Sequence, residues 1–215
     1  MSEFVSRLLK GRKSWWLSDA RKIADQNPYT FHKPSNKAIH MLQPGDQAKL
    51  IFRFESDDPD APNAERMWVE IKSTSGTRFD GVLDNDPVYI EDIECGEPIS
   101  FEEKHIIQVS IDDPVPSEVE KYIARCYVSH RILHDGKGVG YFYREEPDNE
   151  KDSGWRFLSG DESDEYVDDS NNISFVSLGA LLRADDSVLE LLESPIGTQF
   201  ALDPRSRSFV SLGDD

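Results

Sequence analysis

A dense acidic stretch, "GDESDEYVDDSNN" at residues 160–172, holds the side chains with the greatest potential for chemistry. Carboxylates at this density can bind a cation, act as an acid–base pair or attract a basic partner. A calcium loop that began at Asp161 would need Gly at its sixth position and Glu at its twelfth. Tyr166 and Asn172 occupy these positions, so we expect no metal site here.

Catalytic sites find no support elsewhere in the chain. A pair of catalytic carboxylates needs one desolvated member, whereas an acidic run in a polar stretch keeps its members hydrated and ionised. His130 and His134 would share a helix face, but "CYVSHRIL" predicts a strand, in which this spacing separates them. Ser129 precedes His130, yet no orienting carboxylate or oxyanion hole can be located. We predict no catalytic residue, no metal and no cofactor.

Two aromatic residues near the acidic side chains leave a binding role open. Tyr166 has little apolar sequence around it, which indicates either an anchor ringed by carboxylates or a tyrosine lying over a sheet edge. Trp155 lies in a strand-like segment and is either a core residue or part of an interface. The candidate partner-binding residues are Trp155, Asp161, Glu162, Asp164, Glu165, Tyr166 and Asp168.

The whole chain is acidic, with 42 Asp and Glu against 24 Lys and Arg in 215 residues and a net charge of -18. This charge repels nucleic-acid phosphates and anionic membranes and favours basic partners, so we expect neither nucleic-acid nor membrane binding. Cys95 and Cys126 stand alone, which is typical of a reduced cytoplasm. No apolar run has signal-peptide or transmembrane length, and residues 1–17 predict a short docking helix. We expect a cytoplasmic protein.

The first half predicts two short helices and an antiparallel meander. Ser18 as N-cap and Pro28 as a stop indicate a helix over Asp19–Gln26, and "SNKAIHML" indicates a second helix. Apolar and polar residues alternate in "AKLIFRF" and "RMWVEIK", as they do in half-buried strands. The segment "SDDPDAPNAE" between these strands is polar and rich in proline, which predicts an exposed loop.

The run "DDPVPS" separates two regions with strand patterns, and it predicts a domain boundary near Pro116. Ser117 and Glu120 form a capping box that predicts a helix over "EVEKYIAR". Strands are then indicated by "ARCYVSHRIL", "GVGYFYRE", "GWRFLSG" and "NISFVSL", a helix by "DDSVLELLESP", and a final strand pair by "TQFALDPRSRSFVSL".

These elements lack a regular βαβ repeat and therefore predict an α+β fold. We expect two small mixed domains, residues 1–116 and 117–215, each an antiparallel sheet with a few short helices.

The order of four C-terminal segments, "VSHRIL", "VGYFYREEPDNEKDSGWRFLSGDE", "DEY" and "SPIGTQF", resembles the bacterial family of immunity-protein domains numbered thirty-three. This resemblance covers most of residues 122–210. The segment "MWVEIKSTSGTRFDGVLDNDP" is similar to a second small bacterial domain of unknown function, over residues 45–110. The first resemblance implies a cytoplasmic antitoxin of a polymorphic-toxin or contact-dependent competition system, and the second implies no assigned activity.

We therefore expect a non-enzymatic immunity protein that binds a cognate bacterial toxin and blocks it by occlusion. Acidic loops would steer a basic effector into register, and a few aromatic residues would be buried at the centre of the contact. The alternative is an acidic regulatory or adaptor module that binds another basic protein or a cation. An enzyme of unrecognised type is the third class. The toxin, the half that binds it and the oligomeric state stay open.

Overall fold

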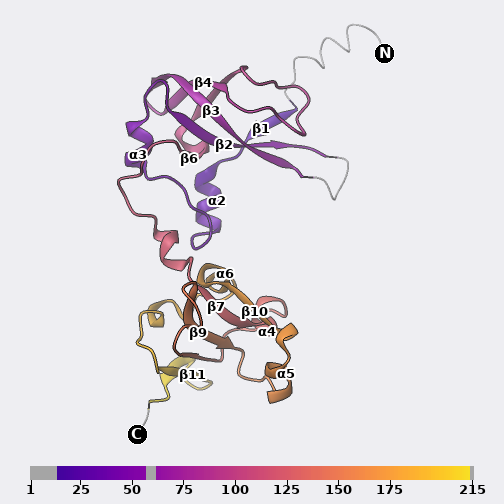
Figure 1. The fold of residues 1–215 in the computed structure, drawn as a ribbon, viewed down its shortest axis with the longest axis vertical. Helices are drawn as coiled ribbons and strands as arrows, with labels where there is room; N and C mark the ends of the chain where they lie inside the picture. The colour runs from indigo at the N-terminus through magenta and orange to yellow at the C-terminus, as the bar shows by residue number, and fades with distance from the viewer. Residues whose placement is uncertain (1–13, 57–61, 214–215) are drawn as a thin grey trace. The chain divides into compact units, whose positions relative to one another are not determined.

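The chain folds into two compact units that are not simply consecutive in sequence. A computed structural model describes residues 14–56 and 62–213. One unit contains Met1–Gln26 and Phe31–Ser117, and the other contains Asn27–Thr30 and Glu118–Asp215 (Figure 1). Both units combine a sheet with short helices, so the α+β class expected from the sequence is confirmed. None of the helices within the described ranges is long and apolar enough to cross a membrane.

The first unit is an antiparallel sheet with two short α-helices. Its elements are β1 (Trp15–Leu17), α2 (Ala20–Gln26), α3 (Asn36–Met41), β2 (Gln47–Phe54), β3 (Ala64–Ser75), β4 (Arg78–Leu83), β5 (Pro98–Glu102), the 3-10 turn η1 (Glu103–His105) and β6 (Ile106–Val109). The strand order is β1-β2-β3-β4-β5, and β6 also pairs with β2. The expected meander is therefore present in β2, β3 and β4.

Alternating apolar residues build the core of this unit. Ala48, Leu50 and Phe52 of β2 are fully buried, and Val69 and Ile71 of β3 pack in the same cluster. The sequence pattern of period two thus corresponds to the face that the sheet buries.

The helix expected over residues 1–17 is not found in the part that the structure describes. Residues 1–13 lie outside the described ranges, and Trp15–Leu17 form strand β1, which pairs with β2. Part of the loop expected between β2 and β3, residues 57–61, also lies outside them.

The second unit contains the sheet that positions the acidic stretch. Its elements are the 3-10 turn η2 (Glu118–Tyr122), β7 (Arg125–Ser129), α4 (His130–Leu133), β8 (Tyr141–Arg144), β9 (Asp152–Leu158), α5 (Asp164–Asp168), η3 (Ser170–Asn172), β10 (Ile173–Ser177), α6 (Leu178–Ala184), η4 (Leu189–Leu191), β11 (Gln199–Asp203) and β12 (Ser208–Ser211). The strand order is β10-β7-β9-β8-β11-β12.

This second sheet is mixed rather than fully antiparallel. Strand β9 inserts between β7 and β8 and runs parallel to β7, while all the other neighbours are antiparallel. The parallel pair arises because α4 and β8 intervene in the chain between β7 and β9. The expected antiparallel sheet is therefore present in the second unit, with the parallel pair β7–β9 as an addition that the sequence did not predict.

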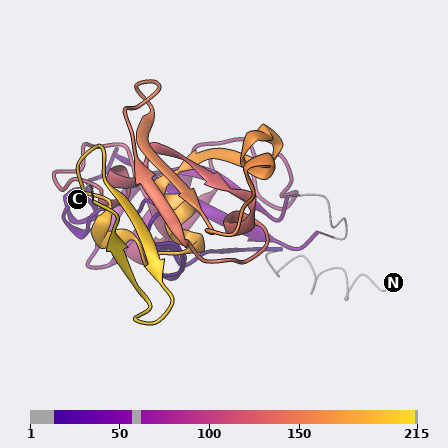
Figure 2. The ribbon, with the colours of Figure 1, turned by 90° about the horizontal axis from the view of Figure 1, so that it is seen from below.

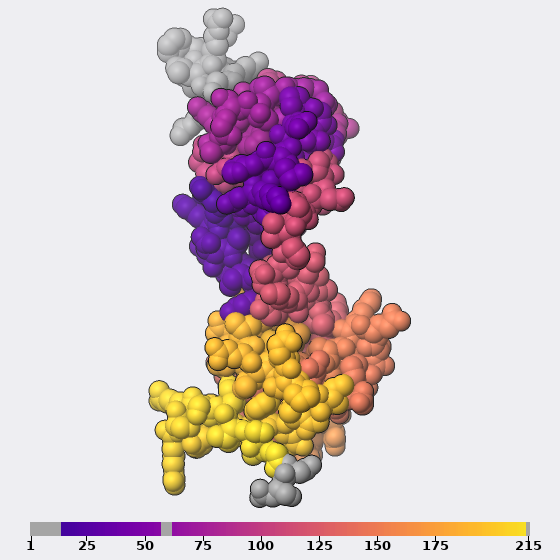
Figure 3. Space-filling view, turned by 90° about the vertical axis from the view of Figure 1, so that its left-hand side faces the viewer, coloured from indigo at the N-terminus to yellow at the C-terminus, as the bar shows by residue number. Residues whose placement is uncertain are grey.

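One face of the second sheet packs into the hydrophobic core of this unit. The buried cluster combines strand residues with residues of α4, α6 and the segment that follows α6, and consists of Cys126, Val128, Ile132, Val139, Phe142, Trp155, Phe157, Leu178, Leu181, Leu182, Val188, Leu192 and Phe200. Viewed from below, α5 and the yellow β11–β12 ribbon lie at opposite sides of this unit (Figure 2). The ribbon also projects from the space-filling surface (Figure 3), and Val210 is 44% exposed there.

Two helix predictions in the second half are wrong in place or type. The segment after Ser117, expected to be a helix, forms the 3-10 turn η2. The helix expected at residues 185–195 is reduced to η4, and the true helix α6 precedes it. The carboxylate of Asp185 accepts hydrogen bonds from the backbone of Val139 and Ser187, so it ties a loop instead of opening a helix.

Candidate functional site

The acidic stretch forms a short helix and a 3-10 turn instead of an irregular loop. The Ser163 hydroxyl accepts a hydrogen bond from the backbone N–H of Tyr166 and caps α5. Asp169 caps η3 through the N–H of Asn171. The side-chain amide of Asn172 donates to the Tyr166 carbonyl at 3.0 Å and joins the two turns. The side chains of the stretch therefore have defined positions.

Asp161 is held by basic side chains of its own unit. Its carboxylate forms ion pairs with Lys137 and, at 2.6 Å, with Arg131, and it accepts a hydrogen bond from the Ser159 hydroxyl. The hydrogen bond from Lys137, with those from Ser159 and Arg131, holds the pKa of Asp161 well below its usual range. Two cations already compensate this charge, so Asp161 fixes the loop more than it attracts a partner.

Glu162 also serves the local structure. It accepts hydrogen bonds from the backbone N–H groups of Ser159 and Gly160, both at 2.9 Å, and from the Ser159 hydroxyl. Burial alone would raise the pKa of Glu162, but hydrogen bonds from Ser129, from Ser159 and from its own backbone outweigh burial and lower it. The carboxylate thus closes the turn between β9 and α5.

The remaining acidic residues of the stretch face solvent. Asp164, Glu165 and Asp168 are exposed on α5. Hydrogen bonds from its own backbone N–H and from Ser163 lower the pKa of Glu165. For Asp164 and Asp168, no ion pair or side-chain hydrogen bond is found among the described residues. Two carboxylates near one another on a short helix are therefore available to a basic partner.

Tyr166 is half-buried on the same helix. The guanidinium carbon of Arg131 lies 4.7 Å from the centre of the Tyr166 ring, within the range of a cation–π contact. Arg131 thus links the ring to Asp161, with which it also forms an ion pair. One side of the ring is already covered, so any partner would meet its remaining exposed part.

Trp155 is a core residue and not a surface anchor. Its side chain is 1% exposed, packs against Phe142 and Phe157, and donates a hydrogen bond from Nε1 to the Leu192 carbonyl at 3.2 Å. The guanidinium of Arg144 lies over the ring at 5.6 Å. Because β9 turns this side chain toward the helices, the interface interpretation of Trp155 is wrong for the folded chain.

The face of the sheet opposite the core carries a row of aromatic residues. Strand pairing places Phe175 of β10 beside Tyr127 of β7, Tyr127 beside Arg156 of β9, and Arg156 beside Tyr143 of β8. Tyr141 lies two residues before Tyr143 and 5.7 Å from it between ring centres. We call these five residues the open face. Its four aromatic side chains are half-buried and lie outside the core cluster.

Arg156 forms the polar centre of the open face, although it is only 7% exposed. Its Nε donates to Glu145 at 2.7 Å, Nη1 donates to Asp152 and to the Trp155 carbonyl, and Nη2 donates to Asp152 and Asp148. These five hydrogen bonds equal the number of N–H donors of a guanidinium. The group is therefore saturated, and its flat surface lies 4.6 Å from the centre of the Tyr127 ring.

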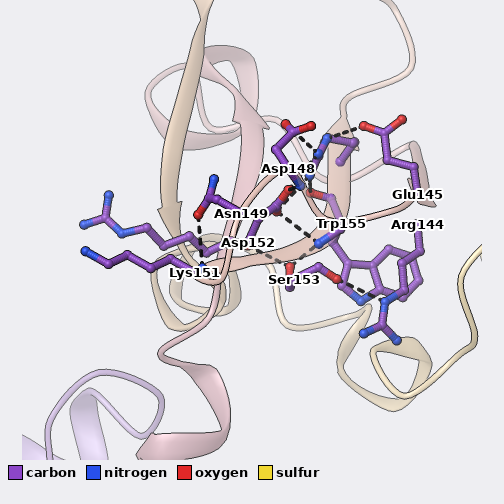
Figure 4. Close-up of polar contacts among 11 residues, drawn as sticks. Arg144, Glu145, Asp148, Asn149, Lys151, Asp152, Ser153 and Trp155 are labelled. Carbon is purple, nitrogen blue, oxygen red and sulfur yellow. Dashed lines mark hydrogen bonds and ion pairs between the residues drawn. The ribbon is translucent and has the colours of Figure 1, made fainter.

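The loop between β8 and β9 supplies Glu145 and Asp148, and the first residue of β9 is Asp152. Asp152 accepts hydrogen bonds from the backbone N–H groups of Asp148 and Gly154 as well as from Arg156 (Figure 4). Burial alone would raise the pKa of Asp152, but the hydrogen bonds of Arg156 and of these N–H groups outweigh burial and lower it. The same contacts raise the pKa of Arg156 against the opposing effect of burial. Both groups are thus ionised at neutral pH.

A pocket of about 270 Å³ opens beside Arg156, between the open face and the acidic helix. It is lined by Tyr127, Tyr143, Arg156, Phe157, Leu158, Val167, Asp168, Ser170 and Ile173. One predicted residue lies here, because Asp168 of the acidic stretch lines a cavity whose other lining residues are largely apolar. No pattern in the sequence predicted this cavity.

The two histidines are closer than the sequence predicts. His130 and His134 lie in and directly after helix α4, and their ring centres are 4.7 Å apart. The expectation that a strand separates them is wrong, because the Ser129 hydroxyl accepts from the backbone N–H of Arg131 and begins a helix at this point. His130 contacts the Ser174 hydroxyl at 2.7 Å. No group of three or more metal-binding side chains occurs within the ranges that the structure describes.

A comparison with protein families bears directly on this second unit. Residues 126–212 match the family model of the immunity protein Imm33 domain. The resemblance of the C-terminal segments to this family is therefore confirmed. The match contains the open face, the pocket and the acidic stretch. No curated protein and no solved structure matches the chain. The similarity of residues 45–110 to a second domain stays a prediction.

Sequence reasoning missed the open face of the second unit, although a signal was present. Tyr141 and Tyr143 alternate with the buried Phe142, and Arg156 alternates with the buried Trp155 and Phe157. Because side chains alternate between the two faces of a strand, this pattern predicts that these residues lie on the face away from the core. What the sequence could not supply was the strand order, because the parallel pairing of β7 and β9 brings Tyr127 beside Arg156.

Proposed function

We propose that this chain is an immunity protein that binds a cognate bacterial toxin through the open face and blocks it by occlusion. The observation that carries the proposal is the row of half-buried aromatic side chains around a saturated arginine, within the range matched by the Imm33 domain. Aromatic residues held in fixed positions are the type of side chain that dominates protein–protein contacts.

Charge supports a basic partner for this face. The chain carries a net charge of -18. Glu145 and Asp148 lie at the edge of the open face, and Asp164, Glu165 and Asp168 lie on the neighbouring helix α5. Such a rim accelerates the approach of a basic toxin, while the aromatic residues slow its release. The protein would act where the toxin acts, in the cytoplasm, without a catalytic step or a cofactor.

The test uses the full chain and the product of the adjacent gene as the candidate toxin. We expect a complex in a pull-down from the source cells and loss of toxicity when both proteins are produced together. Tyr143→Ala should weaken binding at least tenfold in a calorimetric titration, which corresponds to about 1.4 kcal/mol. Tyr89→Ala is the matched control, because Tyr89 is 50% exposed in the first unit.

Two results would contradict the proposal. Equal binding by the Tyr143 and Tyr89 variants would place the interface away from the open face. Failure to bind the adjacent gene product, with capture of an unrelated basic regulator instead, would favour the adaptor alternative.

A further inference from the structure

The pocket beside Arg156 combines an apolar wall with one available carboxylate. Leu158, Val167 and Ile173 supply aliphatic surface, and Val167 is 39% exposed. Asp168 also lines the pocket, and within the described ranges its carboxylate has no hydrogen bond or ion pair. The adjacent acidic residues Asp161 and Glu162 are already held by their own contacts. The pocket therefore offers one carboxylate that is not engaged by another described residue, next to aliphatic surface.

The arginine that lines the pocket does not favour an anionic guest. All the nitrogens of Arg156 donate to Glu145, Asp148, Asp152 or the Trp155 carbonyl. A carboxylate or phosphate that entered the pocket would have to displace one of these contacts, and it would also meet the surrounding negative charges. A cation meets no such obstacle.

We propose that this pocket receives one arginine or lysine side chain of the partner protein. The aliphatic stem would pack on Val167, Leu158 and Ile173, and the cationic head would pair with Asp168. Long basic side chains bury their methylene groups in this way while the charge stays near solvent. The inference rests on the proposed function, and it identifies the type of residue through which a toxin would be recognised.

The geometry fits a single side chain and not a larger ligand. A volume of about 270 Å³ is at the lower end of the range of small-molecule sites. The exposed carboxylate of Asp168 also favours a cationic side chain over a neutral one of the same shape, because only the cation can form an ion pair with it.

The proposal can be tested on the full chain without the toxin. The probe is N-acetyl-L-argininamide, and N-acetyl-L-citrullinamide is the neutral control of nearly equal shape. In methyl NMR spectra we expect the arginine probe to shift the signals of Leu158, Val167 and Ile173, with a dissociation constant on the order of millimolar. The citrulline probe should bind more weakly.

Two variants distinguish binding of the probe in the pocket from its general attraction to an acidic protein. Asp168→Asn should weaken binding of the arginine probe by about twofold to fivefold, the usual value of one partly exposed ion pair. Glu190→Gln, an exposed carboxylate on η4, makes the same change in net charge and should have no effect.

Three outcomes would overturn the proposal. These are no shift of the three methyl groups, equal binding of both probes, and equal effects of the two variants. A toxin that binds the Asp168→Asn protein as tightly as the Glu190→Gln protein would also refute the role of the pocket, while leaving the immunity function intact. Conversely, specific binding of the arginine probe without any toxin complex would support the pocket and contradict the proposed function.

Discussion

Asp152 is the residue on which the polar centre of the open face depends most. Its side chain is fully buried beside Arg156 and also accepts two backbone hydrogen bonds. Asp152→Ala should destabilise the second unit by about 2 kcal/mol or more, because a buried guanidinium loses its main partner and two N–H groups lose their acceptor. Hydrogen exchange of β9 in the full chain measures this loss. Glu150→Ala, an exposed change in the same loop, is the control.

The lowered pKa of Asp152 predicts that the stability of the protein falls as the pH is lowered. The pKa of Asp152 in the folded protein lies below its ordinary value of 3.8. Its contribution to the free energy of unfolding is therefore complete at pH values above 3.8, and it is lost as the pH falls through the pKa of the folded state. The urea midpoint of the parent protein should therefore fall on acidification below about pH 5, and the Asp152→Ala variant should show a shallower fall. Parallel curves for the two proteins would contradict this assignment.

Residue types alone did not indicate the different roles of the side chains within the acidic stretch. Asp161 and Asp168 look equivalent in the sequence, yet Asp161 is paired with Arg131 and Lys137 while Asp168 lines a pocket. The difference arises from α4 and the loop after it, which bring two basic side chains to Asp161. Contacts between residues 24 to 30 positions apart cannot be deduced from local pattern.

At the scale of elements, strands were predicted better than helices. The strand pattern depends on alternation, which survives in short segments such as β8 and β11. The helices α4, α5 and α6 have only four to seven residues, which is fewer than two full turns, so the apolar spacing of an amphipathic helix does not repeat in them. Each of these helices begins after a serine N-cap, at residues 129, 163 and 177. These serines are the feature of the sequence that could have predicted where the helices begin.

Gly179 in helix α6 has a steric role at this scale. A Cβ atom there would lie 2.3 Å from the carbonyl oxygen of Tyr29, in the four-residue segment Asn27–Thr30 that packs in the second unit. Tyr29 also donates a hydrogen bond to Asp186 at 2.9 Å and contacts Tyr122 edge to face. The absence of a side chain at Gly179 therefore allows this segment to pack against the helix.

Gly179→Ala should destabilise the second unit in spite of a better helix propensity. Replacing glycine by alanine gains about 1 kcal/mol in a helix, whereas a clash with rigid backbone costs about 1 to 3 kcal/mol. We expect faster hydrogen exchange in residues 27–30 and a lower pKa of Tyr29, whose phenol is held protonated mainly by its hydrogen bond to Asp186. Gly213→Ala, where a Cβ meets only ordinary contacts, is the control. Unchanged exchange in both variants would contradict the steric role.

At the scale of the whole molecule, the division into units has a consequence for fragments. The boundary expected near Pro116 stays a prediction, and residues 27–30 complicate it because they pack in the second unit. We expect a fragment of residues 117–215 to fold with the same sheet, since its core cluster is contributed by that range. The fragment should be less stable than the same unit in the full chain, because it lacks Tyr29 and therefore the edge-to-face contact between the rings of Tyr29 and Tyr122. Urea unfolding compares the two, and an unfolded fragment would show that the units depend on each other.

The acidic residues of the stretch differ in whether their charge is compensated within the protein, and this difference should appear in the rate of association with a partner. Neutralising Asp164, Glu165 and Asp168 together, by replacement with Asn or Gln, should slow association with the cognate toxin and flatten its salt dependence, because exposed charges steer approach and contribute little to folding. Asp161→Asn should leave the association rate nearly unchanged and loosen the loop, since its charge is compensated by Arg131 and Lys137. Stopped-flow rates across salt concentrations decide this, and equal slopes for the triple variant and the parent protein would show that the acidic helix has no steering role.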